Sequence, residues 1–146
     1  MPTFPSVEWF NAVREITNAD PAFRHLGTVD ATVGVKVGSK LIQLTFEAFE
    51  CTDVREIKDS QLRDLDFWLE QPWENWKDMI ENIKQNGHAD LSHTLNTIDL
   101  SMPEGFARSH DGYRRDAFYR FNQSLQDFFN ASAKIDTQFA EPAAVA

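Results

Sequence analysis

The stretch from Asp64 to Ile83 reads DLDFWLEQPWENWKDMIENI, and its hydrophobic period changes at a proline. Leu65, Phe67 and Leu69 recur at every second position, which is typical of a strand with one buried face. Pro72 has no N–H to donate to a sheet and suits the first turn of a helix. The stretch therefore predicts a strand that leads directly into a helix.

The second half of this stretch has the period of an amphipathic helix. Trp73, Trp76, Ile80 and Ile83 follow one another at three- and four-residue steps and share one face. Gly87 suits the left-handed conformation that ends many helices. Three of the four tryptophans of the chain lie within nine residues, where they can form the wall of an apolar interior or cavity.

Length and composition indicate a single domain with an aromatic interior. The chain has 146 residues, and we expect one domain over residues 1–136 and a disordered tail over 137–146. Twelve phenylalanines and four tryptophans favour a wide, aromatic-lined interior. The net charge of −9, without a cluster of Lys and Arg, argues against binding to nucleic acid or to anionic membranes.

The sequence is typical of a cytoplasmic protein. No stretch approaches the roughly 20 apolar residues of a membrane span, and the first residues do not resemble a secretion signal. The single cysteine, Cys51, excludes an internal disulfide and a multi-cysteine metal site. We expect neither a metal nor a cofactor, and no insertion into a membrane.

The N-terminal part predicts two helices and a hairpin. Ser6 can cap a first helix, and the segment 21–27 begins with proline and ends with glycine, as a short helix does. The segments 29–37 and 41–50 alternate in polarity around a tight turn and predict an antiparallel hairpin. Gly34, inside the first strand, indicates a place where another segment or a ligand comes close.

The remaining segments are less regular until the last helix. Residues 51–63 are rich in charges and lack the regular hydrophobic period of a helix or strand, and we expect a connection with a brief strand around 54–57. Residues 88–100 fit a short helix better than an edge strand, and both alternatives stay open. Residues 102–112 have the glycines and proline of a loop, and residues 113–133 predict an aromatic-rich helix. The elements together predict an α+β domain with an antiparallel sheet.

No constellation of residues predicts a catalytic site. His88 and His93 are five residues apart, which misses the i, i+4 spacing that places two metal ligands on one helix face. We expect both to be solvated at a helix boundary. No nucleophile elbow, phosphate loop or dinucleotide fingerprint is present. The residues thus favour a protein that is not an enzyme.

The aromatic stripes admit two interpretations. They can fill a core at the usual packing density, which is the commoner outcome for such stripes. They can also line a cavity, because a small sheet faced by helices with bulky side chains can fail to close completely.

The order of elements resembles the sterol carrier protein 2-like family, especially its short bacterial members. The resemblance rests on TVDATVGVKVGSKLIQLTFEAFE, LDFWLEQ and PWENWKDMIENI, and it spans roughly residues 6–133. It implies a mostly antiparallel sheet of about five strands covered by helices, with an apolar tunnel between the sheet and the helices. It also implies a carrier or binder of lipids, sterols or fatty acyl groups, without a covalent step.

The predicted function is therefore the binding or transfer of a small hydrophobic ligand between the sheet and the helices. One alternative is a small enzyme of the nuclear transport factor 2-like kind, and another is a module that dimerises through the C-terminal helix. The residues expected to bury the ligand are apolar members of the predicted strands and helices. They are Val35, Leu44, Phe46, Phe67, Trp76, Ile80, Phe118, Phe121 and Leu125.

Overall fold

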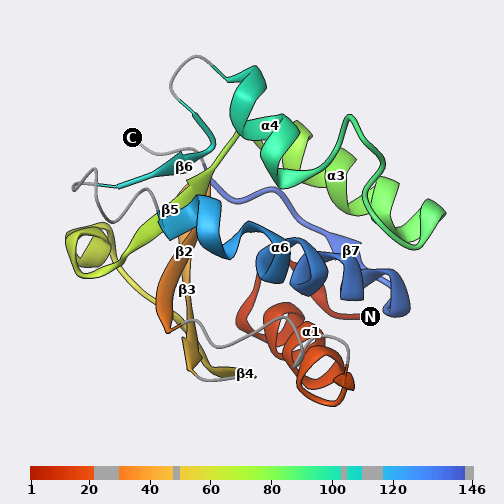
Figure 1. Cartoon of the computed structure of the whole chain (residues 1–146), viewed down its shortest axis with the longest axis horizontal. Helices are drawn as coiled ribbons and strands as arrows, with labels where there is room; N and C mark the ends of the chain where they lie inside the picture. Colours follow the sequence, from red (N-terminus) through yellow and green to blue (C-terminus); the bar gives the residue numbers. More distant parts are fainter. Residues whose placement is uncertain (22–29, 48–49, 103–104, 110–116, 144–146) are drawn as a thin grey trace.

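The chain forms an α+β structure in which helices cover one face of a five-stranded sheet, as predicted. Figure 1 shows the helices α1 (Val7–Asn18), α3 (Trp73–Asn86) and α6 (Ala117–Asn130) on the same side of the strands. The computed structural model describes residues 1–21, 30–47, 50–102, 105–109 and 117–143.

The sheet has the strand order β4-β3-β2-β5-β6. All neighbouring pairs are antiparallel except β2 and β5, which are parallel. The hairpin and the strand before Pro72 are confirmed. The strands are β2 (Ala31–Val37), β3 (Lys40–Glu47), β4 (Glu50–Glu56), β5 (Phe67–Glu70) and β6 (Ala107–Arg108).

Strand β4 confirms that residues 51–63 contain a strand, but it begins at Glu50, four residues before the brief strand predicted around 54–57. The pairing with β3 is irregular between Thr45 and Phe46, so that Cys51 lies opposite Phe46 and Val54 lies opposite Leu44. Cys51 and Val54 are both buried although they are three residues apart. A bulge breaks the two-residue period from which a strand is predicted. A short 3-10 helix, η1 (Asp59–Asp64), follows.

Strand β6 lies in the segment that was predicted to be a loop. The buried Asp99, in α4 (Leu95–Ser101), accepts hydrogen bonds from the N–H groups of Phe106 and Ala107 at 2.7 and 3.0 Å. This carboxylate positions the short edge strand. Asp99 lies seven residues before Phe106, so the local sequence pattern around β6 does not predict a strand.

The helix ends follow the predicted capping chemistry. The N–H of Trp9 donates to the Ser6 hydroxyl at 3.1 Å, and α3 ends at Gly87 with φ at 81°. The segment 88–100 is helical only from Leu95, and Leu91, which precedes the helix, is 89% exposed. The short helix expected over 21–27 lies almost wholly outside the described residues.

The C-terminal segment differs from the expected disordered tail. Strand β7 (Gln138–Phe139) pairs in parallel with β1 (Thr3–Phe4) in a separate two-stranded sheet. The ring of Phe139 lies 6.4 Å from the ring of Phe4 and 6.2 Å from that of Trp73. Aromatic contacts therefore hold the segment against α3.

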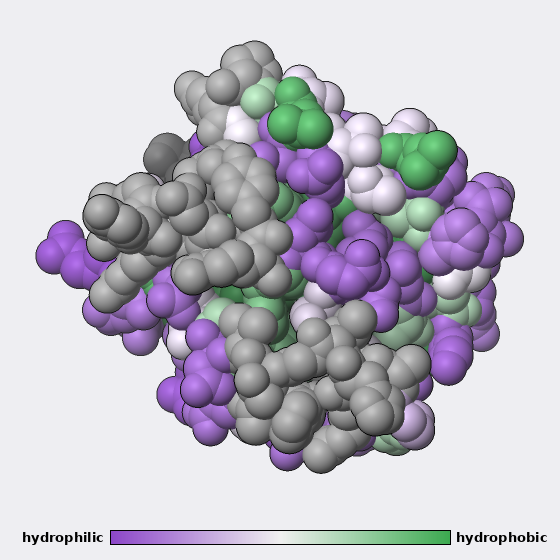
Figure 2. Space-filling model, in the orientation of Figure 1, coloured by the Kyte–Doolittle hydropathy of each residue, from purple (hydrophilic) through white to green (hydrophobic). Residues whose placement is uncertain are grey.

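The surface in view in Figure 2 is mostly hydrophilic. Leu91 and Leu100 are exposed near α4, where the figure shows separate hydrophobic groups among polar neighbours. Phe118, Phe128 and their described apolar neighbours in α6 are buried in the core of the same chain. Among the described residues, no helix has the length and the apolar character needed to cross a bilayer.

The outer face of the sheet has a small apolar cluster of its own, covered by η1. Leu41, Ile57, Leu65 and Trp68 form this cluster (Figure 1, with η1 in yellow). A Cβ at Gly34 would lie 2.6 Å from Leu65 Cδ1 and 2.9 Å from Trp68 Cβ. The close approach predicted at Gly34 is confirmed, and the neighbours come from the chain itself.

We expect Gly34→Ala to lower the free energy of unfolding by about 1–3 kcal/mol, because the added methyl group overlaps Leu65 and Trp68. Urea titration followed by tryptophan fluorescence measures the change. Thr32→Ala, at the half-buried position two residues earlier on the same face, is the control and should change stability by less. Equal stability of Gly34→Ala and the wild type would contradict the close packing.

Candidate functional site

The layer between the sheet and the helices contains every residue that the sequence predicted to bind a ligand. All of them are buried and belong to one hydrophobic cluster. Val35, Leu44, Phe46 and Phe67 come from the strands, and the others come from α3 and α6. The expected burial is therefore observed, while ligand binding by these residues stays a prediction.

Aromatic rings fill much of this layer by direct contact. The Phe46 ring lies 5.1 Å from that of Phe121 and 5.5 Å from that of Phe128, both in edge-to-face arrangements. The rings of Phe67 and Phe118 are 5.8 Å apart. Each of these pairs joins the sheet to α6, and such geometry is favourable beyond the area that it buries.

Trp76 joins α3 to the same layer. Its indole N–H donates to the backbone oxygen of Lys36 at 3.2 Å, and its ring lies 5.3 Å from that of Phe106 and 5.9 Å from that of Phe129. Phe106 was not predicted as a site residue because it lies in the segment that was predicted to be a loop. In the sequence, only the aromatic character of Phe106 could have indicated that it belongs to this layer.

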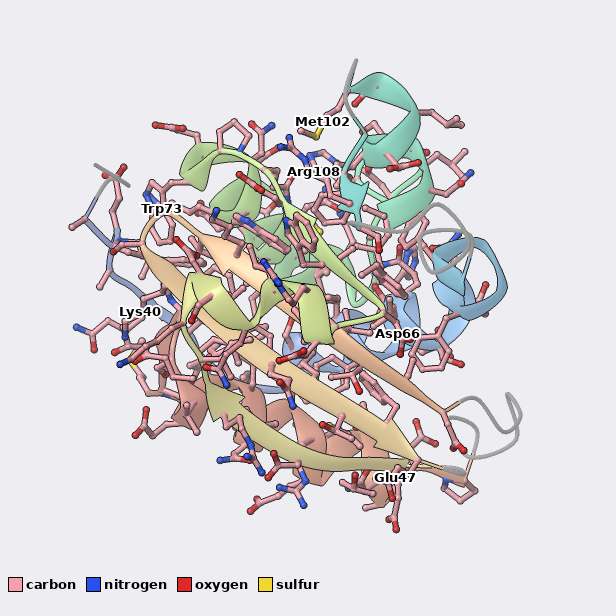
Figure 3. All side chains as sticks on the ribbon, turned by 90° about the vertical axis from the view of Figure 1, so that its left-hand side faces the viewer. Lys40, Glu47, Asp66, Trp73, Met102 and Arg108 are labelled. Atoms are coloured by element: carbon pink, nitrogen blue, oxygen red, sulfur yellow. The ribbon has the colours of Figure 1, made fainter. Side chains whose placement is uncertain are left out.

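Of the predicted residues, Phe46 lies both in the core and in the wall of a surface cavity of about 660 Å³. We call this cavity the Phe46 opening. Figure 3 places Glu47 and Asp66, which line it, at one end of the sheet. Its lining residues are Asp30, Ala31, Thr32, Thr45, Phe46, Glu47 and Asp66.

Carboxylates surround the Phe46 opening. The carboxylate of Asp66 accepts the N–H of Thr32 at 2.8 Å, and the N–H of Asp66 donates to the carbonyl of Thr32 at 2.9 Å. These bonds tie the start of β5 to β2. Asp30 and Glu47 are exposed at the same opening. Three of the described residues that line the opening therefore carry a carboxylate.

Ile80 lines a different cavity, of about 350 Å³, between α3 and the segment around β7. Glu81 and Lys84 of α3 and Phe139 of β7 contribute to its wall. Charged side chains flank the apolar surface there, and neither Phe46 nor an α6 residue takes part. The predicted residues therefore do not share one cavity.

His93 is the centre of a polar cluster that links α3 to the segment before α4. Its Nδ1 lies 2.6 Å from Asp90 and its Nε2 lies 2.6 Å from Asp78. The hydrogen bond to Asp90 raises the pKa of His93, the contact with Asp78 adds to the rise, and partial burial opposes it. The same bond, with those from Asn82 and Ser92, holds the pKa of Asp90 well below its usual range.

This cluster corrects the expectation of a solvated His93, whose side chain is 24% exposed. The Ser92 hydroxyl lies 3.1 Å from Nδ1, which superficially suggests a nucleophile beside its base. Both ring nitrogens, however, face carboxylates, and this environment favours an imidazolium that donates on both sides. An imidazolium has no free lone pair, so it cannot activate Ser92 as a general base.

Cys51 is the remaining candidate nucleophile that lies within the described residues. Burial raises the pKa of the Cys51 thiol to about 11, so that the thiol stays protonated at neutral pH and is a poor nucleophile. In the described part of the chain, no group of three or more His, Cys, Asp or Glu side chains is placed to hold a metal ion.

The pKa shifts predict how the His93 cluster affects stability. His93 binds its proton more tightly in the folded state, so its contribution is complete below its usual pKa of 6.5 and is lost as the pH rises through the raised value. The lowered pKa of Asp90 makes the Asp90 contribution complete above 3.8.

We therefore expect His93→Gln to lower the melting temperature most between about pH 4.5 and 6 and least near pH 9. Thermal unfolding followed by circular dichroism at several pH values measures the difference from the wild type. His88→Gln is the matched control, because His88 is exposed and bonds only to the neighbouring Ala89 carbonyl in the described contacts. A pH-independent difference for His93→Gln would contradict the assigned ion pairs.

Comparisons with known proteins do not assign this chain to a family. No protein-family model, no curated protein and no solved structure matches it. The features of the chain that bear on its function are the aromatic layer, the openings to the surface and the buried polar groups.

Proposed function

We propose that this protein binds a small hydrophobic molecule, without a covalent step, between the sheet and helix α6. The ligand enters at the Phe46 opening. The observation that carries the proposal is the double position of Phe46, whose side chain lines the opening and contacts Phe121 and Phe128 of α6. A ligand that moves this ring reaches apolar surface on both sides.

The energetics favour a ligand with a long apolar part. Separating Phe46 from Phe121 and Phe128 costs about 0.5–1.5 kcal/mol for each ring pair. Each methylene of a ligand that becomes buried contributes about 0.8 kcal/mol. A chain with several buried methylenes therefore outweighs the lost ring contacts, whereas a very small apolar molecule does not.

The charges at the opening select the polar end of the ligand. Asp30, Glu47 and Asp66 lie around the opening, and the whole chain has a net charge of −9. A free carboxylate would meet unfavourable electrostatics there, whereas a hydroxyl or ammonium group would not. We infer a lipid-like ligand with a neutral or cationic head group. The resemblance to sterol carrier protein 2-like proteins implies a lipid, sterol or fatty acyl ligand and does not specify its head group.

Three molecules with the same twelve-carbon chain separate these possibilities. We expect dodecanol and dodecylamine to bind at least tenfold more tightly than dodecanoate at low salt, because only dodecanoate brings a negative charge to the opening. Isothermal titration calorimetry below the micellar concentrations measures the affinities. Dodecanoate that binds as well as dodecylamine would contradict the assigned head group.

A second variant tests the location. We expect Phe46→Trp to weaken dodecanol binding roughly tenfold, because the larger ring narrows the opening and packs more tightly against α6. Leu41→Phe is the matched control, since it enlarges a buried residue of the outer cluster on the other face of the sheet. The same loss of dodecanol binding in both variants would place the ligand elsewhere or attribute the loss to general destabilisation.

A further inference from the structure

A third cavity lies at the opposite end of the sheet from the Phe46 opening. Figure 3 places Trp73 and Met102, which line it together with Arg108, away from Glu47 at the other end of the sheet. Its volume is about 470 Å³, within the range of small-molecule sites. We call it the Gln71 pocket, because Gln71 joins these residues in its wall where β5 passes into α3.

Gln71 is a buried amide without a partner. The residue is 5% exposed, and neither Oε1 nor Nε2 makes a hydrogen bond to any described residue. An amide withdrawn from water without replacement bonds is costly and rare in folded proteins. Both a donor and an acceptor are therefore left unsatisfied at the same side chain.

Gln126 shows how the same chain satisfies a buried glutamine. This residue is 9% exposed, its Oε1 accepts the N–H of Leu95 at 2.8 Å, and its Nε2 donates to Asn130 Oδ1 at 3.0 Å. The unpaired amide of Gln71 is thus not a general feature of the buried glutamines in the described residues. Both amide atoms are buried, so a bound molecule supplies the missing partners when the Gln71 side chain turns toward the pocket about its torsions.

The first turn of α3 adds hydrogen-bond donors at the same place. Pro72 occupies the N-cap position and has no side chain that accepts a hydrogen bond. The N–H groups of Trp73 and Glu74 make no hydrogen bond within the described part of the chain, as is usual for the first residues of a helix. These donors and the helix dipole favour a ligand oxygen beside Gln71.

Both cations in the wall of the pocket are paired within the chain, and Glu74 and Glu141 add two further carboxylates to the wall. Lys36 Nζ lies 3.9 Å from Asp59, and Arg108 Nη1 lies 3.6 Å from Glu70. Trp73 and Met102 add half-buried apolar surface to the wall. The pocket therefore fits an uncharged polar group attached to a flat apolar body.

We propose that the Gln71 pocket binds a small uncharged molecule that has a carboxamide edge, with a carbonyl beside an N–H, on an aromatic ring. Gln71 Nε2 donates to the ligand carbonyl, and Oε1 accepts the ligand N–H. The ligand ring packs against Trp73. This site is separate from the hydrophobic-ligand site, because the two cavities lie at opposite ends of the sheet.

Benzamide is the probe, and benzoate and benzylamine are its charged counterparts of the same size. Two-dimensional ¹H–¹⁵N NMR of the full chain measures binding through the side-chain NH₂ signals of Gln71 and the indole signal of Trp73. We expect both signals to shift with benzamide, and affinities for benzoate and benzylamine that are at least fivefold weaker.

Gln71→Met tests the role of the amide with an apolar side chain of similar size. We expect at least a tenfold loss of benzamide affinity, because two hydrogen bonds disappear. The melting temperature of the unliganded protein should rise, because the variant removes two unpaired buried polar atoms. Gln126→Met is the matched control and should lower the melting temperature, since it leaves the Leu95 N–H without its partner.

Three results would overturn the proposal: absence of benzamide binding, unchanged benzamide affinity in Gln71→Met, or a lower melting temperature of that variant. Phe46→Trp provides the comparison with the other site. It should leave benzamide affinity unchanged while it weakens dodecanol binding. Failure of either cavity to bind its probe is therefore distinguishable from failure of the other.

Discussion

The contact between the inner face of the sheet and the aromatic side of α6 is the constraint on which the structure depends. Phe46 and Phe67 point from neighbouring parts of the sheet toward Phe121 and Phe118, and the rings meet edge to face. Successive side chains of a strand point to opposite faces. This contact therefore fixes which alternate residues of β2, β3 and β5 point toward the helices. The helices then gather on that side, and the other face is left to η1 (Figure 1).

The outer face of the sheet is covered by a much smaller apolar cluster than the inner face. Its apolar cluster is small, and it forms only because Gly34 leaves room for Leu65 and Trp68 to approach the backbone of β2. A larger residue at this position would push the segment before β5 away from the sheet. The same segment provides Asp66, whose bonds to Thr32 fix one wall of the Phe46 opening. Packing on the outer face thus positions the proposed site on the inner one.

Some buried polar groups build the fold, whereas Gln71, Asn122 and Ser132 have side-chain atoms without a partner among the described residues. Of these three residues, Gln71 lines one of the cavities described above. Asp99 holds the start of β6, and Gln126 holds the start of α4, each by hydrogen bonds to backbone N–H groups. Gln71 is as deeply buried, yet its amide has no partner among the described residues. Departures from otherwise consistent local rules are expected at functional positions. Gln71 is therefore the point at which the physical chemistry of the structure suggests a ligand.

The sequence by itself determined the helices and strands whose pattern is local. Ser6, Pro72 and Gly87 mark helix ends, and the alternation around Phe67 identifies a strand. The strand is buried on both faces, however, because Trp68 belongs to the outer cluster and Phe67 to the inner core. The apolar character of the predicted ligand residues was also enough to predict that all of them are buried.

The tertiary structure alone decided the features that depend on distant partners. The bulge beside Phe46 places Cys51 and Val54 on one face, Asp99 creates β6, and pairing with β1 orders the segment around β7. Asp78 reaches His93 from α3, across fifteen positions of the chain. Register, ion pairs and unpaired amides are properties of groups brought together in space, so the period and composition of a single segment do not specify them.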